Sequence, residues 1–441
     1  MSMYWNEEAE TIPREKLEAI QLQRLQDTVQ RAYENVPFYR QALDERGVNP
    51  QSIRALSDVA VLPFTTKQDF RDTYPFGLMA VPIDRVVRIH ASSGTTGKPV
   101  TAYYTQKDLD NWANLMARVL TAGGLRKGDL LQNAYGYGLF TGGLGAHDGA
   151  QLIGAAVVPS SVGNSRRQIL LIQDLGVTGL ACTPSYALII GETARELGVD
   201  LATTSKLRVG FFGAEPCSEP MRKEIEDVLG LKALDIYGLT EILGPGVAHE
   251  CLNQKGLHLA EDNFLVEVID PETGQKAAPG QKGELVLTTL TKEAMPILRY
   301  RTRDIVSLYP DQCPCGRTFV RMTKITGRTD DMLIVRGVNV FPSQIEDALL
   351  RVDGLEPHYQ IVVDRDSHLD ELEVWVEVSE DIFTDEMAPL ETLELKVGKE
   401  LETVLGIWTK VRLVEPGTLE RSEGKAKRVI DRRELGTTKD N

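Results

Sequence analysis

Strands and helices alternate along residues 85–245, and this alternation constrains the fold more than any other feature of the sequence. A helix is predicted from about Arg166 to Leu175, the apolar run "VTGLAC" follows, and the next helix ends near Leu197. The run "LRVGFFG", the helical segment "EPMRKEIEDVLG" and the run "ALDIY" continue the pattern. Strand-length apolar runs separated by amphipathic helices predict a parallel sheet with helices on both faces. The expected fold class is therefore α/β.

Different patterns flank this region. Before it, apolar residues spaced by three or four predict an amphipathic helix that Pro37 stops; they are Leu22, Leu25, Val29, Tyr33 and Val36. After Gly246, the runs "NFLVEVID", "GELVLTTL" and "RDIVSLY", with turn residues between them, predict an antiparallel β segment.

The C-terminal part of the chain changes pattern again. Between Leu372 and Val378, apolar residues alternate with polar ones apart from Trp375. A helix is predicted near Glu391 to Leu405, and the strand "TKVRLV" follows. This pattern predicts a small α+β domain joined near "GRTDDM". We therefore expect a large domain over residues 1–328 and a small, mobile domain over residues 329–441.

The charge balance limits the possible partners. Lysine and arginine number 49 and aspartate and glutamate 64, so the formal net charge is −15, which disfavours nonspecific binding to nucleic acid or to acidic membranes. The start of the chain shows no basic and apolar leader pattern, and no apolar run is long enough to span a membrane. We expect a cytoplasmic protein with no nucleic-acid or membrane partner.

The stretch "ASSGTTGKPV" over residues 91–100 concentrates glycines, hydroxyls and one lysine. It does not match the Walker loop, because Ser92 stands where that loop has its first glycine and Pro99 follows Lys98 in place of Ser or Thr. Glycines still allow backbone N–H groups to converge on an anion. The sequence predicts a phosphate-binding loop, with a plain surface turn as the alternative.

Two more loops follow predicted strands of the sheet, "GAEP" at Gly213–Pro216 and "YGLTE" at Tyr237–Glu241. Ligands of open parallel sheets bind beyond the carboxyl ends of the strands, so both loops are expected to line one crevice. Tyr237 can stack on a base, Thr240 can donate to a phosphate, and Glu241 can bind Mg²⁺. Taken singly, Tyr237 also suits a core position and Glu241 the start of a helix.

Six motifs occur in a fixed order: "SSGTTGKP", "GAEP", "YGLTE", "RYRTRD", "GRTDDMLIVRGVNVFPSQIE" and "RSEGKAKR". On these motifs the chain resembles the adenylate-forming acyl-CoA ligase superfamily. Within it, the chain is similar to the phenylacetate-CoA ligase family almost from end to end. The resemblance implies that a carboxylic acid reacts with ATP to give an acyl adenylate and pyrophosphate, after which the thiol of coenzyme A displaces AMP.

The resemblance also implies roles for individual residues. Ser92 to Lys98 would bind the β- and γ-phosphates, Glu241 would bind magnesium beside Thr240, and Asp304 would accept the ribose hydroxyls. Arg328 would reach the nucleotide. The residues implied in phosphate binding are Ser92, Ser93, Gly94, Thr95, Thr96, Gly97 and Lys98, and those implied around adenine are Gly213, Ala214, Glu215, Pro216, Asp235, Ile236, Tyr237 and Gly238.

Two further residues are implied in the conformational cycle of the enzyme. Lys425 matches the family lysine that bridges the substrate carboxylate and the α-phosphate, although Lys427 is the alternative if the register is shifted, and both also fit a solvated basic run. Asp330 matches the hinge position. The small domain would then present Lys425 for adenylation and a different face for thioester formation.

The acid itself is expected to bind near "NAYGYGLFTGGLGAH". The residues expected to line an apolar slot for an aryl ring are Tyr135, Phe140, Ala214, Ile236 and Pro245, with core packing as the alternative for each. Another aromatic acid, a carrier-protein thiol or a cofactor hydroxyl as the acceptor, a phosphoryl-transfer kinase and a silent nucleotide-binding protein remain alternatives. A homodimer is expected by family resemblance.

The chain has five cysteines, which are too few for a disulfide framework and an odd number. Cys313 and Cys315 form a close pair, and Cys251 and His258 lie in the preceding β segment, with His249 nearby. Three thiolates and one imidazole are a common closed zinc set. We expect Cys251, His258, Cys313 and Cys315 to bind a structural zinc, with ordinary free cysteines as the alternative.

Overall fold

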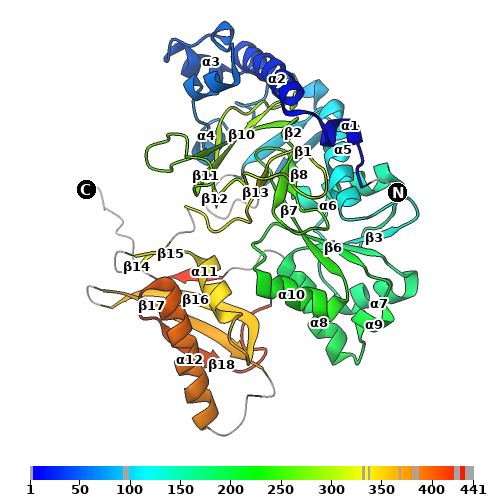
Figure 1. Ribbon diagram of the computed structural model, residues 1–441, viewed down its shortest axis with the longest axis vertical. Helices are drawn as coiled ribbons and strands as arrows, with labels where there is room; N and C mark the ends of the chain where they lie inside the picture. The colour runs from blue at the N-terminus through cyan, green and yellow to red at the C-terminus, as the bar shows by residue number, and fades with distance from the viewer. Residues whose placement is uncertain are drawn as a thin grey trace.

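The computed structural model of the protein describes residues 3–92, 99–329, 333–335, 338–366, 369–379, 382, 387–421 and 428–432. Its larger part contains an eight-stranded sheet in the order β13-β9-β8-β7-β6-β5-β3-β4 (Figure 1). The strands from β4 to β7 pair in parallel, which confirms the predicted sheet. These strands are β3 (Leu130–Asn133), β4 (Ala156–Val158), β5 (Gly179–Cys182), β6 (Val209–Phe212) and β7 (Lys232–Leu239).

Helices cover both faces of the parallel strands, as the alternation of buried residues along them requires. On β5, Ala181 packs into one core, whereas its neighbours Leu180 and Cys182 pack into another. Helices α5 and α6 contribute to the first core, and α7, α8 and α10 to the second. The helices are α5 (Gln106–Ala122), α6 (Thr141–Ile153), α7 (Ser165–Leu175), α8 (Pro184–Glu196), α9 (Leu201–Thr204) and α10 (Glu219–Leu229).

Local signals explain where these helices begin and end. The Ser218 side chain accepts a hydrogen bond from the backbone N–H of Met221, which caps the start of α10. Gly230 ends the helix at φ +66°, and a Cβ there would lie 2.6 Å from the Cα of Ala202. Glycine is therefore required at this position for its backbone conformation and for the close approach of α9.

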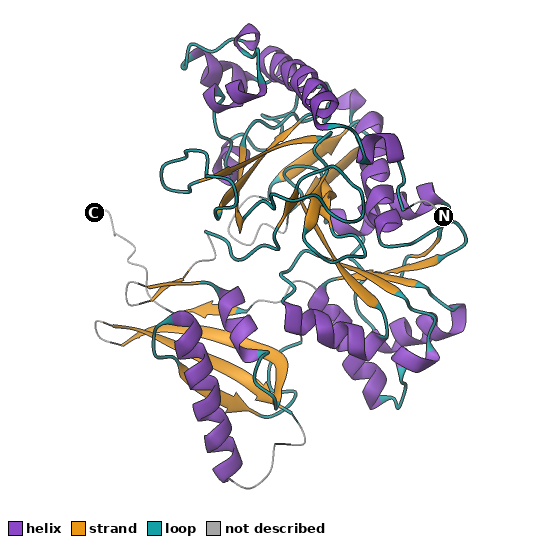
Figure 2. Ribbon diagram, in the orientation of Figure 1, coloured by secondary structure: helices purple, strands orange, loops and turns teal. Residues whose placement is uncertain are grey.

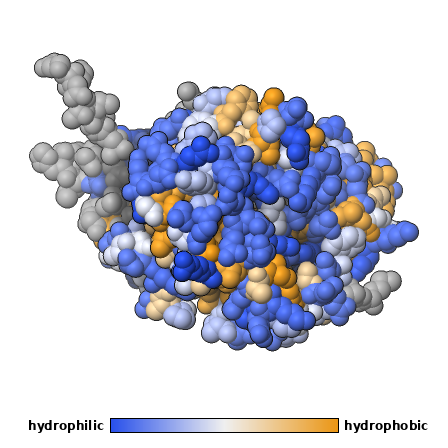
Figure 3. Space-filling model, turned by 90° about the horizontal axis from the view of Figure 1, so that it is seen from above, coloured by the Kyte–Doolittle hydropathy of each residue, from blue (hydrophilic) through white to orange (hydrophobic). Residues whose placement is uncertain are grey.

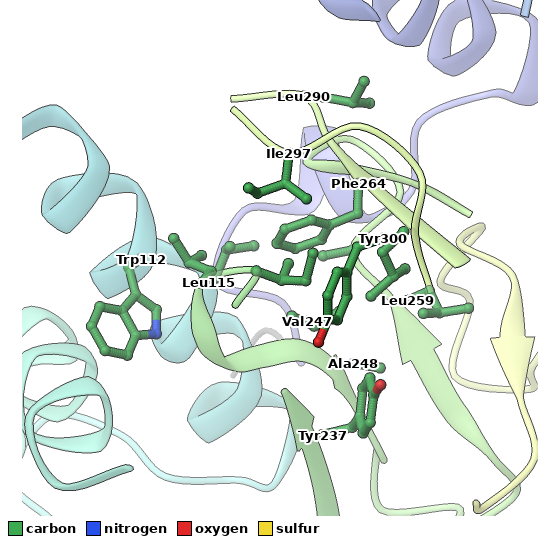
Figure 4. Close-up of a cluster of buried hydrophobic side chains, with 14 of the residues drawn as sticks. Trp112, Leu115, Tyr237, Val247, Ala248, Leu259, Phe264, Leu290, Ile297 and Tyr300 are labelled. Carbon is green, nitrogen blue, oxygen red and sulfur yellow. The ribbon is translucent and has the colours of Figure 1, made fainter. Parts of the chain in front are cut away.

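The sheet continues beyond β7 with three antiparallel strands, β8 (Gly244–His249), β9 (Leu257–Leu259) and β13 (Arg321–Met322). The predicted antiparallel segment after Gly246 instead forms a second sheet in the order β10-β11-β12. Its strands are β10 (Phe264–Ile269), β11 (Gly283–Thr289) and β12 (Tyr300–Val306). The strand predicted within "RDIVSLY" thus starts earlier, at Tyr300. Figure 4 shows side chains of both sheets meeting Trp112 and Leu115 of α5 in one buried cluster.

The N-terminal segment folds into helices over the second sheet (Figure 1). Helix α2 ends at Asn35, so the predicted stop is confirmed, and Pro37 begins the next helix because its missing N–H is not needed there. The elements here are α1 (Glu7–Glu10), α2 (Arg14–Asn35), α3 (Pro37–Asp44), α4 (Lys67–Asp72), the hairpin strands β1 (Arg88–Ala91) and β2 (Thr101–Tyr104), and 3₁₀ turns at Pro50–Ser52, Leu56–Val61 and Ile83–Arg85.

The C-terminal part is α+β, as predicted, and has a core of its own. Its four-stranded sheet has the order β18-β17-β16-β19, and α12 packs beside α11 (Figure 2). Helix α12 begins at Met387, earlier than expected. The elements are β14 (Leu333–Val335), β15 (Val338–Val340), α11 (Pro342–Leu349), β16 (Leu355–Asp366), β17 (Leu369–Val378), α12 (Met387–Leu405), β18 (Lys410–Val414) and β19 (Val429–Asp431). The domain boundary at 328/329 stays a prediction.

Among the described residues, no helix combines the length and the apolar character needed to cross a membrane. The face seen in Figure 3 is mainly hydrophilic, with smaller hydrophobic areas between the polar ones. Scattered apolar side chains of this kind are ordinary for a protein surface.

Candidate active site

The two predicted loops lie side by side at the carboxyl edge of β6 and β7. These strands pair in parallel with Phe212 opposite Asp235, so Gly213–Pro216 runs beside the end of β7. A Cβ on Gly213 would lie 2.4 Å from the carbonyl oxygen of Ile236, which shows how closely the two segments approach. Both predicted loops therefore lie at the same edge of the sheet, and the crevice between them stays a prediction.

Asp304 and Arg328 join Tyr237 at this edge. The hydroxyl of Tyr237 donates to Oδ2 of Asp304 at 2.6 Å, and Nη1 of Arg328 donates to Oδ1 at 2.8 Å. Burial, followed by the Asp304 charge, raises the pKa of Tyr237 well above its usual range. Tyr237 is 7% exposed and packs at the border of the cluster drawn in Figure 4, so the ring also has the core role considered as the alternative.

Two carboxylates belong to these segments, Glu215 in the first loop and Asp235 on β7. The Glu215 carboxylate accepts hydrogen bonds from the hydroxyl of Ser185 at 2.7 Å and from its backbone N–H at 3.4 Å. Burial, followed by repulsion from Glu250, raises the pKa of Asp235 to about 7. Asp235 therefore carries little charge in acid and becomes an anion above neutral pH.

The turn after β7 carries Thr240 and Glu241, and both side chains are buried. Lys292, which the sequence analysis did not single out, is only 3% exposed and donates from Nζ to the carbonyl oxygen of Ile242 at 2.9 Å. Its ammonium also lies 4.7 Å from the ring centre of Tyr104. Burial lowers the pKa of Lys292 to about 8, against the opposing charges of Asp108 and Glu241. Nothing local in "LTKEAM" distinguishes this lysine from a surface residue.

We expect Lys292→Met to lower the free energy of unfolding by about 1–3 kcal/mol. Methionine fills the space but cannot donate, so the buried carbonyl of Ile242 loses its partner. Urea denaturation followed by circular dichroism measures the change. Lys107→Met, at a side chain 73% exposed, is the matched control and should change stability by less than about 0.5 kcal/mol.

Three of the residues expected around the acid, Tyr135, Phe140 and Pro245, lie beside glycines of α6. A Cβ on Gly142 would lie 2.7 Å from the ring of Phe140 and 3.3 Å from that of Tyr135, and a Cβ on Gly145 would lie 3.1 Å from Pro245. The Tyr135 hydroxyl donates to the carbonyl oxygen of Phe211, just before the first paired loop. Of the expected set, Tyr135 and Ile236 are buried, whereas Ala214 and Phe140 are exposed.

In sequence, the glycine-rich stretch connects β1 to β2, and these two strands pair antiparallel. The Ser92 backbone N–H donates to the carbonyl oxygen of Val100 at 2.9 Å, next to the paired ends of β1 and β2. The Ala91 N–H donates to the carbonyl oxygen of Leu139, next to Phe140. The predicted phosphate-binding residues Ser93, Gly94, Thr95, Thr96, Gly97 and Lys98 lie outside the described residues, as do Asp330 and Lys425.

The four predicted metal ligands come together away from this edge. The ligand atoms of Cys251, His258, Cys313 and Cys315 all lie within 4.8 Å of one another, and the four residues are buried. The Sγ atoms of Cys251 and Cys313 are 3.7 Å apart, and Sγ of Cys315 is 3.5 Å from Nε2 of His258. Tetrahedral zinc with bonds of about 2.3 Å places neighbouring sulfur ligands about 3.8 Å apart. The predicted convergence of these side chains is confirmed.

His249 lies beside this cluster, with its ring centre 5.9 Å from that of His258. Neither ring nitrogen of His249 has a hydrogen-bond partner among the described residues. Burial lowers its pKa well below the usual range. The four ligands predicted from the sequence, which do not include His249, are therefore the same four side chains that converge in the structure.

Comparison with known proteins identifies the family. The family model described as "AMP-binding enzyme" matches residues 61–290, and "AMP-binding enzyme C-terminal domain" matches residues 337–433. The chain is 52% identical to the phenylacetate-coenzyme A ligase of Escherichia coli (strain K12), with 97% of each chain covered. The chain belongs to the phenylacetate-CoA ligase family of AMP-binding enzymes. The ligase of Thermus thermophilus is 51% identical over 98% of this chain and 100% of its own.

A more distant enzyme of the same fold adds information about domain arrangement. The chain is similar to crystal structures of 2-hydroxyisobutyryl-CoA ligase. For the postadenylation state with 2-HIB-AMP, the sequence identity is 33% and the TM-score is 0.92, and the match covers 98% of this chain and 92% of the other. For the thioesterification state with 2-HIB-AMP and CoA, the sequence identity is 34% and the TM-score is 0.73, and the match covers 98% of this chain and 93% of the other. The whole chain thus superposes much better on the first state.

Proposed function

We propose that this protein ligates phenylacetate, or a closely similar aromatic acid, to coenzyme A in two steps. First, an oxygen of the acid's carboxylate bonds to the α-phosphorus of ATP while the bond to pyrophosphate breaks. Then the thiol sulfur of coenzyme A, losing its proton, bonds to the carbonyl carbon while AMP leaves. The observation that carries this proposal is that Gly213–Pro216, Tyr237–Glu241 and the Asp304–Arg328 pair meet at one sheet edge.

The residues at this edge suit the parts of a nucleotide. Gly213–Pro216 and the end of β7 offer flat backbone and the Tyr237 ring as a frame for adenine, together with Asp235, Ile236 and Gly238. The Asp304 carboxylate, which pairs with Arg328, would accept hydroxyl groups of a ribose. Ser92–Lys98 would supply donors to the outer phosphates.

Glu241 is the residue that would hold magnesium. Its carboxylate is buried and has no salt bridge within 4.0 Å among the residues that the structure describes, so a hard cation with oxygen ligands fits it. When bound, the ion would offset negative charge on the triphosphate. Thr240, beside it, would donate a hydrogen bond to a phosphate oxygen, and Lys292 would fix the backbone of the turn.

The aromatic part of the acid would lie on the glycine face of α6, between the rings of Tyr135 and Phe140 and the side chain of Pro245. Ala214 and Ile236 would close the slot from the sheet side. An apolar slot distinguishes acids that differ by one methylene by only about 1–3 kcal/mol. Phenylacetate is therefore proposed from the relatives and the slot together.

Acid-dependent exchange of pyrophosphate into ATP, measured over a panel of aryl acids with and without coenzyme A, tests the proposal. We expect exchange with phenylacetate in the absence of coenzyme A, and phenylacetyl-CoA and AMP in its presence. Production of ADP would indicate a kinase instead. Exchange with no thioester formation would point to another acceptor, such as a carrier-protein thiol or a hydroxyl.

We expect Asp304→Asn to lower kcat/KM for ATP by roughly 10- to 100-fold, because hydrogen bonds to a charged acceptor contribute about 1.5–3 kcal/mol. Steady-state kinetics at saturating acid and coenzyme A measure the effect. Asp227→Asn, which makes the same chemical change at a side chain 64% exposed on α10, is the control. Unchanged ATP dependence in Asp304→Asn would contradict the ribose role.

We also propose that zinc binds Cys251, His258, Cys313 and Cys315 as a structural ion, because three thiols and an imidazole lie at the spacing of a tetrahedral site. The N-terminal segment packs on this cluster: the Tyr4 hydroxyl donates to the carbonyl oxygen of Cys315 at 2.7 Å, and Arg317 pairs with Glu10 at 2.8 Å. The metal would therefore anchor the start of the chain. A homodimer stays a prediction.

The domain arrangement supports assigning this structure to the first half-reaction. The relative that superposes on the whole chain with a TM-score of 0.92 is in its postadenylation state. We infer that the small domain lies here in the position used for adenylation, and that a second position serves thioester formation.

A further inference from the structure

A polar contact joins the C-terminal part of the chain to the edge that carries the paired loops. Arg428 lies directly before β19, and its carbonyl oxygen accepts the backbone N–H of Ile361 on β16 at 2.7 Å. Its guanidinium reaches across to α8, where Nη2 donates to the hydroxyl of Ser185 at 3.4 Å. Ser185 in turn donates to the Glu215 carboxylate at 2.7 Å. One chain of hydrogen bonds therefore links β19 to the first loop of the site.

The guanidinium of Arg428 is fixed on its own side of this contact. It lies 4.3 Å from the ring centre of Tyr359, donates to the carbonyl oxygen of Pro357 at 3.4 Å, and pairs with Glu346 at 3.5 Å. The Arg428 side chain is 18% exposed and that of Glu346 6% exposed. A planar guanidinium stacked and paired in this way loses little further freedom when it bonds to Ser185.

Charge favours the same arrangement. Glu346, in the C-terminal part, and Glu215, in the site loop, repel each other across the contact, and burial followed by this repulsion raises the pKa of Glu346 to about 7 against the opposing effect of Arg428. Arg428 is the cation between the two carboxylates. Without it, docking the two parts would bring like charges together in a poorly solvated place.

We propose that Arg428 is a positioning residue for adenylation, which holds the C-terminal part against the Ser185–Glu215 pair while Lys425 acts. This inference rests on the proposed function. Lys425 is three residues before Arg428 in the sequence, and three residues span at most about 10 Å, so we expect the contact of Arg428 to help position the lysine. Thioester formation, which uses a second arrangement, does not require the contact.

Separate assays of the two half-reactions test this proposal. We expect Arg428→Gln to lower the single-turnover rate of acyl-adenylate formation, at saturating ATP and phenylacetate, about 10-fold, the effect of losing one hydrogen bond to a charged group. Thioester formation from supplied phenylacetyl adenylate and coenzyme A should change less than about 2-fold. Arg428→Lys should recover part of the lost rate.

Ser185→Ala tests the same contact from its other side, because it removes only one hydroxyl at the start of α8. It should slow adenylation selectively as well, and adding it to Arg428→Gln should cause little further loss, since both changes break the same contact. Arg412→Gln is the matched control. Arg412 stacks on Trp375 and lies on β18, at the opposite edge of the four-stranded sheet from β19.

Two results would overturn the proposal. One is an equal fall in both half-reactions for Ser185→Ala and Arg428→Gln, which would indicate damage to the fold or to nucleotide binding. The other is parental adenylation by both variants. If the parental protein itself shows no acid-dependent exchange, the proposed function fails first, and that outcome is distinct from a selective effect of Arg428.

Discussion

Replacing Lys425 by alanine should lower the rate of acyl-adenylate formation about 100-fold or more. In the proposed first step, negative charge develops on the oxygens around the α-phosphorus as the carboxylate approaches it. A cation aimed at that charge typically contributes a factor of about 10²–10³. ATP–pyrophosphate exchange with phenylacetate, at saturating substrates, measures the loss.

The same variant should still convert supplied phenylacetyl adenylate and coenzyme A to the thioester, because the lysine is not needed once the adenylate exists. This split separates a catalytic role from a general loss of structure. Lys427→Ala is the matched control, two residues further along the same basic run. If Lys427→Ala loses exchange and Lys425→Ala retains it, Lys427 is the catalytic lysine and the assignment of Lys425 is wrong.

Of the changes considered, removal of the proposed zinc should lower the stability of the fold most. The ligands Cys251 and Cys315 enclose a loop of about sixty residues, and a cross-link over such a loop contributes about 4 kcal/mol. We therefore expect purified protein to contain stoichiometric zinc by elemental analysis. A strong chelator, or Cys315→Ser, should lower Tm and expose the segment around Tyr4 to protease, because this segment hydrogen-bonds to the Cys315 carbonyl.

Two substitutions serve as controls for the metal site. Cys217→Ala removes a buried thiol outside the cluster and should leave the zinc content unchanged. His249→Gln should keep the metal as well, whereas His258→Gln should lose it, because only His258 places a ring nitrogen among the four converging ligand atoms. Protein that contains no zinc and has the same Tm with and without chelator would show that the four residues are a plain buried cluster.

Much of the parallel sheet followed from sequence alone. Helices α7, α8 and α10 have boundaries close to those predicted, because caps such as Ser218 and Gly230 and the helical spacing of apolar residues act within a few positions along the chain. The order of motifs identified the family for the same reason: each motif is a short, local requirement. The cysteine and histidine set was also predictable, since Cys313 and Cys315 form a close pair and Cys251 and His258 lie in the preceding β segment.

The sequence did not reveal how the β segment after β7 divides. Strands β8, β9 and β13 extend the main sheet, whereas β10, β11 and β12 form another, and alternation along a strand is the same in both cases. Which sheet a strand joins depends on partners far away in the chain. The starts of β12 and α12 also differ from those predicted, since these elements begin at Tyr300 and Met387.

The sequence by itself determined the fold class, the family and the residue types available for chemistry. Only the tertiary structure decided that Lys292 is a buried cation under the Glu241 turn and that Arg428 reaches Ser185 across the two parts of the molecule. A lysine or arginine looks the same in sequence whether water or protein surrounds it. Its charge acquires a role when packing removes the water and leaves a carbonyl, a hydroxyl or a carboxylate as its partner.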